Sequence, residues 1–385
     1  MRIVHYLSAF RLADGGVVRS VLDLTALLAA RGHEVFVLTR DASDVPPSWR
    51  QAVSGAPLLV ELSRPPRLAG RFDRESMKEA RRLIAEAHVV HLHAPWDVAN
   101  LQFARLARRA KVPYVVTAHG MLDDWSMAQR GAKKRAYLAM FGRRLLERAA
   151  FVHCTAQAEQ EQARRWFPRG RSCVVPYVVD LDPFRTLPGD ALIRQRLPQT
   201  DTDRPVVLFL SRLHVKKRPE ALIDAAAILR TRDRPLRVII AGSGDDDYVR
   251  SLHARIDRAG LREDAHLVGL VVGDEKLSLY QRADVFAMAT SQENFGLVYT
   301  EAMSCGTPVI ATKGTDIWRE LEASGGAIVV DGSPRSIADA IQRLLDDRPL
   351  LERMGRAGRE WMFREFDGDR IVARFEDMYG RCAAA

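Results

Sequence analysis

The chain has 385 residues, of which 47% are hydrophobic and 28% charged, an ordinary globular composition in a chain too long for one core. Its 58 Lys and Arg against 49 Asp and Glu give a net charge of +9, which favours anionic partners such as nucleotides, phospholipid surfaces or nucleic acid. No apolar run approaches the roughly 20 residues of a membrane span, and the N-terminal segment reaches a charge too soon for a signal peptide, so we expect a cytoplasmic protein. The four cysteines form no CxxC pair, so we expect neither a disulfide framework nor a zinc site.

The first half of the chain alternates short β-branched runs with longer helical patterns. Strands are expected at residues 2–8, 34–39, 56–62, 87–93, 113–119, 150–155 and 172–176. After the first of them, Val17, Val21, Leu24 and Leu28 recur at helical spacing, and Gly32 follows where that helix should end. Strands separated by helices predict a parallel sheet with helical crossovers.

The same pattern resumes in the second half, after a polar segment near residues 185–203. Strands are expected there at residues 204–213, 236–244, 264–270, 283–290, 307–312 and 326–330. The economical interpretation is an α/β protein with two doubly wound, Rossmann-like domains joined by the polar segment.

Ligands of open α/β sheets bind beyond the carboxyl ends of the strands, so the residues that follow each strand are candidates for a site. Six strand ends carry polar or glycine-rich sequences, which is more than the fold alone requires. They are Gly15-Gly16, His93, His119, Arg212 to Lys217, Gly242 to Gly244, and Glu293 to Glu301.

The stretch SQENFGLVYTEAMSCGTPVIAT holds two glutamates, Glu293 and Glu301, with seven residues between them. On one continuous helix they would lie off a common face, which argues against a hydrolytic pair that attacks one bond. A helix that begins near Gly296 would instead offer free amides to a phosphate, while the carboxylates accept hydrogen bonds from sugar or ribose hydroxyls. The pattern fits a nucleotide-sugar about as well as it fits two solvated glutamates.

The turn SRLHVKKRPE places Arg212 and Lys217 five residues apart after a strand. A guanidinium fork and an ammonium group suit a diphosphate, and the alternative is a solvated basic turn. Gly15-Gly16 allow the backbone to approach a ligand closely, or form only a tight turn. The segment IIAGSGDDD lacks the third glycine of a dinucleotide fingerprint, and its aspartates would repel a pyrophosphate, which disfavours a nicotinamide enzyme.

Histidines and one acidic triplet also lie near strand ends. His119 directly follows a strand at the expected ligand edge, which favours a functional role over a structural one. We expect His91 and His93 to point to opposite faces of their strand and therefore to share no metal ion. Asp180 and Asp182 form a DxD triplet, which we interpret as structural because no partnering ligand stands beside it in the sequence.

Residues 129–148 are strongly basic, with Leu138, Phe141 and Leu145 at helical spacing. Such a helix either rests on an anionic lipid surface or is the solvated face of a domain helix. The second outcome is the more frequent one, so peripheral membrane contact through 129–148 stays an open alternative.

Together these residues resemble the retaining glycosyltransferases of the GT-B fold, of the family 4 type with the "glycosyl transferases group 1" C-terminal domain. The resemblance runs along nearly the whole chain and is most specific where the E-x7-E pattern of Glu293 and Glu301 combines with the SRL-x-x-x-K turn. It implies two Rossmann-like domains facing a cleft, an acceptor-binding domain at 1–190 and a nucleotide-sugar-binding domain at 203–365. A final helix at 366–385 would pack back on the first domain.

By position, the resemblance implies catalytic roles for His119, Arg212, Lys217 and Glu293. Arg212 and Lys217 would hold the donor diphosphate, while Glu293 and His119 would lie at the transferred sugar. The implied donor-binding residues are Gly16, in the glycine-rich loop on the acceptor side, and Asn294, Phe295, Gly296, Leu297 and Glu301, the last at the ribose hydroxyls. Two positions depart from the family pattern: Tyr177-Val178 replace Asn-Gly, and Lys217-Arg218 replace Lys-Gly.

The resemblance implies a hexosyltransferase without metal or cofactor, which moves a sugar from a nucleotide-diphosphate sugar to a saccharide or lipid-linked acceptor with retention of configuration. Cell-surface polysaccharide or glycoconjugate synthesis at the inner face of the membrane would suit such an enzyme. A nucleotide-sugar epimerase of the same fold is the alternative within enzymes. A basic nucleic-acid-binding module is disfavoured, because no aromatic stacking platforms interleave with the basic residues.

Overall fold

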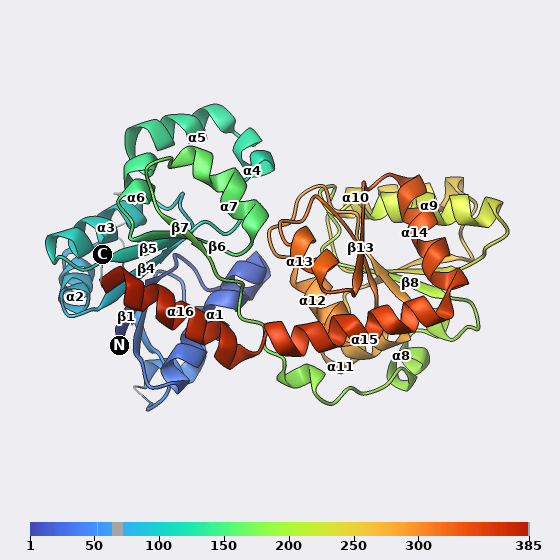
Figure 1. Ribbon diagram of the computed structural model, residues 1–385, viewed down its shortest axis with the longest axis horizontal. Helices are drawn as coiled ribbons and strands as arrows, with labels where there is room; N and C mark the ends of the chain where they lie inside the picture. Colours follow the sequence, from blue (N-terminus) through green and yellow to red (C-terminus); the bar gives the residue numbers. More distant parts are fainter. Residues whose placement is uncertain (52, 64–71, 384–385) are drawn as a thin grey trace. The chain divides into compact units, whose positions relative to one another are not determined.

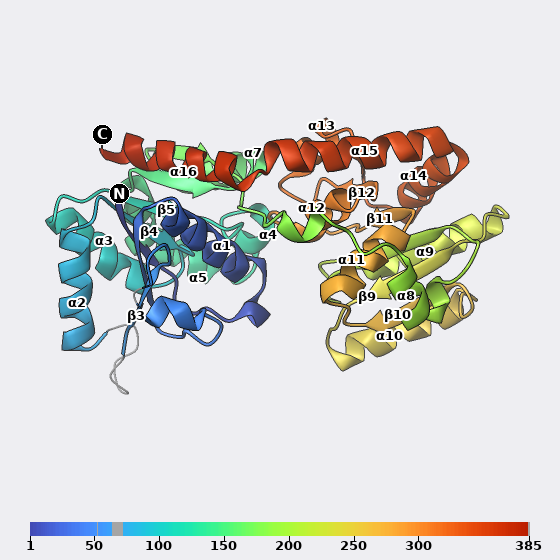
Figure 2. The same cartoon turned by 90° about the horizontal axis from the view of Figure 1, so that it is seen from below.

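The computed structural model describes residues 1–51, 53–63 and 72–383, which form two compact units (Figures 1 and 2). The N-terminal unit comprises Met1–Val179 with Gly368–Ala385, and the C-terminal unit comprises Asp180–Asp367. We describe each unit by itself. Among the described residues, no helix combines the length and the apolar character that crossing a membrane requires.

The N-terminal unit is built on seven parallel strands in the order β3-β2-β1-β4-β5-β6-β7. They are β1 (Arg2–Tyr6), β2 (Glu34–Thr39), β3 (Leu58–Glu61), β4 (Val89–His93), β5 (Tyr114–Thr117), β6 (Phe151–Cys154) and β7 (Ser172–Val174). Each lies within a strand expected from the sequence. In the centre, Ile3 of β1 pairs with Val35 of β2 on one side and with Val89 of β4 on the other.

Helices cross between these strands, as the alternating pattern predicts. They are α1 (Gly16–Ala30), α2 (Arg74–Ala85), α3 (Ala99–Arg109), α4 (Asp124–Ala128), α5 (Gly131–Tyr137), the π-helix η3 (Leu138–Gly142), α6 (Arg143–Glu147), α7 (Gln157–Ala163) and α16 (Gly368–Ala383). Three 3-10 turns accompany them: η1 (Leu12–Asp14), η2 (Pro47–Arg50) and η4 (Arg164–Trp166). Val21, Leu24 and Leu28 form the buried stripe of α1, which ends at Ala30 just before Gly32.

The first and last helices of the chain, α1 and α16, pack on the same face of the N-terminal sheet (Figures 1 and 2). Ile371 and Phe375 of α16 are buried in the apolar core that α1 forms with the strands. At the surface, Arg31 after α1 donates hydrogen bonds to Asp369 at 2.9 Å and to Glu376 at 3.0 Å. The amphipathic pattern of α16 is therefore satisfied within the N-terminal unit.

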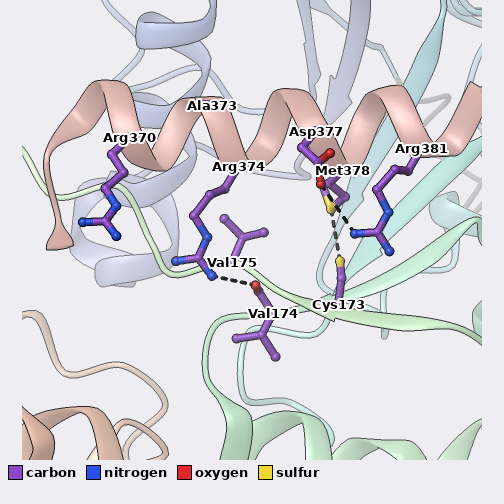
Figure 3. A pocket seen from close by; sticks show the side chains of 9 residues that line it. All are labelled: Cys173, Val174, Val175, Arg370, Ala373, Arg374, Asp377, Met378 and Arg381. Carbon is purple, nitrogen blue, oxygen red and sulfur yellow. Dashed lines mark hydrogen bonds and ion pairs between the residues drawn. The ribbon is translucent and has the colours of Figure 1, made fainter.

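A groove of about 450 Å³ runs between α16 and β7 (Figure 3). Arg370, Arg374 and Arg381 line its helical side, and Arg374 donates a hydrogen bond to the Val174 carbonyl of β7 at 3.0 Å. Strand β7 is the outer strand of the sheet, and an arginine on its edge discourages pairing with another chain.

The C-terminal unit is built on six parallel strands in the order β10-β9-β8-β11-β12-β13. They are β8 (Val206–Leu210), β9 (Arg237–Ala241), β10 (Ala265–Gly269), β11 (Val285–Ala287), β12 (Val309–Thr312) and β13 (Ala327–Val330), each within an expected strand. The helices are α8 (Ala191–Arg196), α9 (Pro219–Thr231), α10 (Asp246–Arg258), α11 (Gly273–Arg282), α12 (Leu297–Ser304), α13 (Trp318–Ala323), α14 (Pro334–Asp346) and α15 (Arg348–Glu365). Two 3-10 turns, η5 (Asp182–Phe184) and η6 (Pro198–Thr200), precede β8.

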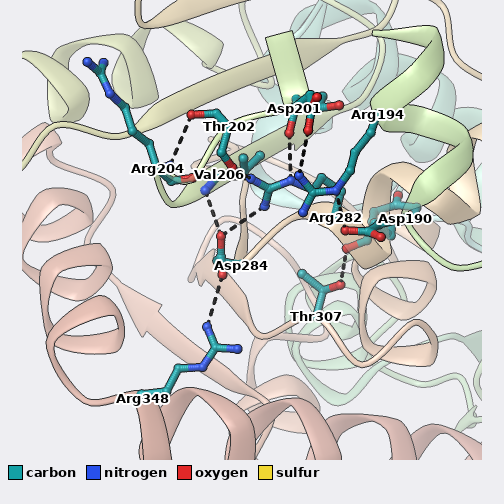
Figure 4. A network of polar contacts seen from close by, with 12 residues as sticks. Asp190, Arg194, Asp201, Thr202, Arg204, Val206, Arg282, Asp284, Thr307 and Arg348 are labelled. Atoms are coloured by element: carbon teal, nitrogen blue, oxygen red, sulfur yellow. Dashed lines mark hydrogen bonds and ion pairs between the residues drawn. The ribbon is translucent and has the colours of Figure 1, made fainter. Parts of the chain in front are cut away.

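The polar segment that we expected to join the domains folds onto the C-terminal unit. Buried Arg282 donates hydrogen bonds to the carbonyls of Thr200 at 2.8 Å and Thr202 at 2.7 Å (Figure 4). Asp284 accepts a hydrogen bond from the Val206 amide at 2.8 Å, where β8 begins. These bonds satisfy a buried guanidinium that would otherwise destabilise the fold, and they fix the path of the chain into β8.

Candidate functional site

The strand order of each sheet turns back at its first strand, and the candidate residues gather at these turning points. In the C-terminal unit, the chain runs from β8 outward to β9 and β10, then returns to place β11 on the other side of β8. Open α/β sheets bind ligands at such a point, beyond the carboxyl ends of the two central strands. Residues 211–218 follow β8, and residues 288–296 follow β11.

The turn after β8, which carries Arg212, packs backbone to backbone on the turn after β9. Leu213 donates a hydrogen bond to the Ser243 carbonyl at 2.8 Å. Gly242 has a φ of 141°, and a Cβ at this position would lie 1.9 Å from the Ser211 carbonyl oxygen. The glycines of IIAGSG therefore allow two protein backbones to meet, because any side chain would separate them.

Lys217 forms an ion pair with Glu293 although it is only 8% exposed. Burial, together with the positive charges of Lys216 and Arg212, lowers the pKa of Lys217 to about 7. The Glu293 carboxylate opposes this shift, since an opposite charge favours the ammonium form. A diphosphate that enters here therefore meets an ammonium group that is poorly hydrated and gains strongly from a second anionic partner.

Two further loops hold this ion pair in place. The Lys216 carbonyl accepts hydrogen bonds from the Ser291 amide at 2.9 Å and from the Thr290 hydroxyl at 3.0 Å. The Glu293 amide donates to the Gly314 carbonyl at 2.7 Å, which ties the loop after β11 to the loop after β12. The carboxyl ends of β8, β11 and β12 thus position Lys217 and Glu293 jointly.

Helix α12 begins directly after Gly296, as expected, and Gly296 has the positive φ of 68° that favours glycine. Leu297 is the first helical residue, and only the Tyr299 amide of this turn donates to the residue before the helix, the Gly296 carbonyl at 2.9 Å, in the bonds that the structure describes. The first amides of a helix have no acceptor one turn back and suit an anion. Phe295 is buried against Phe366, with ring centroids 5.7 Å apart, so its side chain belongs to the core of this unit. Asn294 donates a hydrogen bond to Asp316 at 3.2 Å.

Glu301 lies in the second turn of α12, also as expected, and helix α11 fixes its carboxylate. Lys276 donates to it at 2.8 Å and the Tyr280 hydroxyl at 3.0 Å. Burial and the Glu301 charge raise the pKa of Tyr280 well above its usual value, so this phenol stays a hydrogen-bond donor. Each carboxylate oxygen keeps a second lone pair, which a hydroxyl of a ligand can use.

Sequence reasoning missed Lys276, Tyr280 and Asp316 as partners of the candidate residues. Lys276 and Tyr280 are four residues apart and share one face of α11, a spacing that the sequence displays. The sequence does not indicate that this face of α11 contacts Glu301, because α11 and α12 are separate helices that come together only in the folded structure.

Arg218 explains one departure from the family pattern. It precedes α9 with a φ of 55°, in the left-handed region where the family often has glycine. A residue with a Cβ costs about 1–2 kcal/mol in this conformation. Its neighbour Arg212 is exposed, and it makes no ion pair with another residue in the described ranges.

The remaining two expected site residues, Gly16 and His119, belong to the N-terminal unit. Gly16 is the first residue of α1 and is exposed, after Gly15 with a φ of 105°. His119 follows β5 with a φ of 52° and is only 6% exposed. Its Nε2 lies 3.1 Å from Nδ1 of His93, and its Nδ1 lies 2.6 Å from the Tyr177 hydroxyl. Both ring nitrogens are therefore engaged inside this unit.

The expectation that His91 and His93 point to opposite faces of β4 is wrong. Side chains alternate along a strand, so residues two apart share a face, and the two rings stack with centroids 4.3 Å apart and 25° between their planes. His5 of β1 joins them, and one ring nitrogen from each of the three lies within 4.8 Å of the others. Imidazole lone pairs lie in the ring plane, so the two nearly parallel stacked rings cannot aim at one ion.

The DxD triplet forms a local turn in the C-terminal unit. The Asp182 amide donates to the Asp180 carboxylate at 3.1 Å, and Asp182 pairs with Arg185 at 3.0 Å. These contacts agree with a structural interpretation of the triplet.

Two family models match the chain, one in each half. The model described as "Glycosyl transferase 4-like domain" matches residues 15–178, and "Glycosyl transferases group 1" matches residues 193–361. A D-inositol 3-phosphate glycosyltransferase of Xylanimonas cellulosilytica is 30% identical over 95% of this chain and 92% of its own length. A GDP-mannose-dependent alpha-(1-6)-phosphatidylinositol monomannoside mannosyltransferase of Mycobacterium tuberculosis is 31% identical over 77% of each chain.

Solved structures share the architecture at lower sequence identity. HepE of Anabaena in complex with UDP superimposes with a TM-score of 0.81 and 22% identity, over 99% of this chain and 100% of the other. Sucrose-phosphate synthase of Thermosynechococcus elongatus gives a TM-score of 0.73 with 22% identity, over 100% of each chain. At such identity these matches establish the fold.

Proposed function

The chain belongs to the group 1 glycosyl transferases and has the GT-B fold, and we propose that it moves a hexose from a nucleoside-diphosphate sugar to a saccharide or lipid-linked acceptor with retention of configuration. The relatives whose names contain GDP-mannose or inositol phosphate support a donor and an acceptor of these chemical classes. Synthesis of a cell-surface polysaccharide or glycoconjugate, on the cytoplasmic side of the membrane, suits such an enzyme.

The observation that carries the proposal is the charge arrangement where β8, β11 and β12 end. Lys217 is buried, paired with Glu293 and close enough to Arg212 for that charge to lower its pKa. The amides that open α12 lie in the same loop as Glu293. A diphosphate satisfies all of these groups, since it carries two negative centres for the two cations and further oxygens for the amides.

The reaction that we propose needs no metal and no nucleophilic side chain. The bond from the anomeric carbon to the diphosphate oxygen breaks, and its electron pair stays with the departing diphosphate. The acceptor oxygen bonds to the same face of the anomeric carbon, and its proton passes to the departing oxygen. Lys217 and Arg212 stabilise the charge that builds on the diphosphate, which lowers the barrier because that charge is larger in the transition state.

The other residues of this loop hold the donor in the proposal. Glu301 accepts hydrogen bonds from the ribose hydroxyls while Lys276 and Tyr280 keep its carboxylate in place. Glu293 and the backbone of residues 294–297 contact the transferred sugar and the phosphate. Gly16 and His119 of the N-terminal unit contact the transferred sugar from their own loops.

Thermal-shift measurements against UDP-glucose, GDP-mannose and ADP-glucose identify the donor, because a ligand that binds the folded state raises the melting temperature. The configuration of the product is then followed by NMR during turnover with an acceptor. Early appearance of the retained anomer supports the proposal, and the inverted anomer contradicts it. Quantitative isomerisation of the donor without acceptor would instead identify an epimerase.

Peripheral membrane contact belongs to the same proposal. A groove of about 220 Å³ lies between α3 and α6, and beside it Met140 and Phe141 of the π-helix are 58% and 45% exposed. Four arginines line this groove: Arg105, Arg108, Arg144 and Arg148. Exposed apolar side chains within a basic rim suit the boundary of an anionic bilayer.

Vesicle sedimentation tests this contact. Vesicles of phosphatidylcholine with phosphatidylglycerol should bind the protein, and vesicles of phosphatidylcholine alone should not. The double variant Phe141→Ser with Arg144→Glu should lose binding, whereas Arg250→Glu, a matched charge change on exposed α10, should keep it. Equal binding of the two variants would rule out this surface.

A further inference from the structure

His119 lies in a tight turn whose backbone has an uncommon conformation. The turn spans residues 118–121 and closes where the Met121 amide donates to the Ala118 carbonyl at 3.0 Å. Its two central residues both have positive φ values, 52° for His119 and 69° for Gly120, as in a type I′ turn. Glycine adopts this backbone readily, but a residue with a Cβ keeps it only where its surroundings hold it there. The groups that hold this turn therefore also set where the His119 ring lies.

The amide that follows His119 is held by a buried carboxylate from the next helix. Glu159, in the first turn of α7, is fully buried, and its Oε1 accepts a hydrogen bond from the Gly120 amide at 2.5 Å. Its Oε2 accepts two more, from the Thr155 amide at 2.5 Å and from the Thr155 hydroxyl at 2.8 Å. Glu159 thus joins the chain that follows β5 to the chain that follows β6.

The two sides of this carboxylate have different purposes. A glutamate in the first turn of a helix often reaches back to a free amide just before that helix, and the bonds to Thr155 are of this kind. The bond to Gly120 lies outside α7 and contributes nothing to the helix. It fixes the peptide group between His119 and Gly120, and the Ser126 hydroxyl holds the carbonyl of the same glycine at 2.9 Å.

The pattern of donors around Glu159 requires a carboxylate. Both of its oxygens accept from a backbone N–H group, whereas an amide of the same shape has one oxygen that accepts and one NH2 group that only donates. The oxygen of a Gln side chain would turn toward the two donors of Thr155, since that side offers more bonds. Its NH2 group would then face the Gly120 N–H group, donor against donor, and the turn would lose its bond.

We infer that Glu159 is a positioning residue for His119, because its carboxylate holds the turn of residues 118–121 in the conformation that places the imidazole at the end of β5. The inference rests on the proposed function only for the contact between His119 and the transferred sugar. Displacement of such a group by about 1 Å can lower turnover about 100-fold, since the groups around a reacting centre must be held close to their productive geometry.

The Gly120 amide is observable by itself, because His119-Gly120 is the only His-Gly pair in the sequence. Protein labelled with ¹³C at histidine carbonyls and with ¹⁵N in glycine therefore gives one signal in a carbonyl-edited NMR spectrum. The bond to the carboxylate should shift this proton downfield and protect it from exchange. In Glu159→Gln the shift should be lost and exchange should become about 10–100-fold faster, as for loss of a hydrogen bond to a charged group. An unprotected amide in the parent protein, or an unchanged one in Glu159→Gln, overturns the inference.

The second arm follows release of nucleoside diphosphate from UDP-glucose, GDP-mannose and ADP-glucose. Glu159→Gln should lower kcat about 10–100-fold. Binding of UDP or GDP should stay unchanged, because the groups that hold the diphosphate in the proposal belong to the C-terminal unit. Glu161→Gln is the matched control, since it removes the same charge from an exposed position of the same helix and should leave kcat close to that of the parent protein. Equal kcat values in the two variants overturn the inference, even where the Gly120 signal differs.

Ser126→Ala keeps the test decisive if Glu159→Gln does not fold. It removes the bond to the Gly120 carbonyl from a partly exposed position, so it should speed exchange of the Gly120 amide and lower kcat about 2–10-fold, as for one neutral hydrogen bond. Faster exchange with an unchanged kcat overturns the inference. If the parent protein turns over none of the three donors, the proposed function fails, while the Gly120 amide still decides whether Glu159 holds the turn.

Discussion

The two units share a strand order, but the side chains at the point where that order turns back are charged in one unit and neutral in the other. Where β8 and β11 end, the C-terminal unit keeps formal charges as close pairs, Lys217 with Glu293 and Lys276 with Glu301. Where β1 and β4 end, the N-terminal unit buries neutral imidazoles that bond to one another and to hydroxyls. The same topology therefore carries paired charges at one turning point and neutral, mutually hydrogen-bonded imidazoles at the other.

This difference has a physical cost on each side. A buried charge loses hydration free energy, and the attraction of its partner offsets that loss. Replacing one partner therefore destabilises the folded protein strongly. A neutral histidine loses little on burial, but it must be protonated whenever the surrounding structure opens in acid. The two units should consequently fail under different conditions.

Acid should break the N-terminal unit first, and this is the largest expected effect. The unit buries five histidines, His5, His91, His93, His119 and His153. Burial holds the folded pKa values of the five histidines below the unfolded value of about 6.5, so their contribution to stability is complete above pH 6.5 and is lost as pH falls, toward 3–4 for His5, His119 and His153. Below pH 6.5 the unfolding free energy should fall by up to about 1.4 kcal/mol per pH unit for each histidine that stays neutral in the folded state. Urea titrations between pH 8 and 5 measure this slope, and hydrogen exchange identifies the unit that opens.

His153→Leu should reduce that slope by about one fifth, because one of the five titrating rings is gone. His253→Gln, in the exposed part of α10, should leave it unchanged. A free energy of unfolding that is equal at pH 8 and pH 5 would show that the buried rings are already charged.

Loss of the buried ammonium group should be the largest effect on turnover. Lys217→Ala should lower kcat on the order of 10²–10³-fold, as expected for one preorganised charge contact in the transition state. KM for the donor should rise less, since Arg212 and the α12 amides still hold the diphosphate. Lys216→Ala is the matched control, because it also removes a lysine from this turn but not one that contacts the diphosphate in the proposal; loss of its charge only raises the pKa of Lys217 and keeps that group an ammonium ion. Full turnover by a folded Lys217→Ala protein would refute the mechanism.

Loss of the Glu301 carboxylate should weaken binding of the donor rather than slow its turnover. Glu301→Ala should raise the donor KM about 10–100-fold, in line with about 1.5–3 kcal/mol for hydrogen bonds to a charged group, and change kcat less. Ribose hydroxyls gain no charge during the reaction, so they contribute equally in the ground and transition states. Steady-state kinetics separate the two constants. A kcat loss as large as that of Lys217→Ala would contradict the division of roles.

Replacing Gly242, at which the turns after β8 and β9 pack together, should give the smallest of the four effects. Gly242→Ala places a methyl group against the Ser211 carbonyl and should destabilise the protein by about 1–3 kcal/mol while displacing Arg212. Gly380→Ala on α16 meets open space at ordinary helical φ and should be neutral or slightly stabilising. Thermal melts with and without UDP or GDP compare them, and equal melting temperatures would show that the two turns do not pack as described.

Much of the fold follows from local pattern. The β-branched runs predict the strands, and the Glu293 to Glu301 stretch predicts that α12 begins after Gly296 with Glu301 in its second turn. The site residues of the C-terminal unit follow from the same pattern, because loops after neighbouring parallel strands must end at one edge of the sheet. What failed was the treatment of His91 and His93, where the period of two along a strand was misapplied.

Local sequence patterns suffice to predict the strands, the helix starts and the charged residues at strand ends, because these features depend on neighbours within a few positions. The folded structure is needed to show that Lys217 pairs with Glu293, that Lys276 of α11 binds Glu301, and that five scattered histidines are joined by hydrogen bonds. Such contacts join residues from 21 to 288 positions apart, and a hydrogen bond depends on distances of a few tenths of an ångström. The spacing of residues along the chain does not predict distances to that precision. The contacts at both turning points therefore become visible only in the folded sheets.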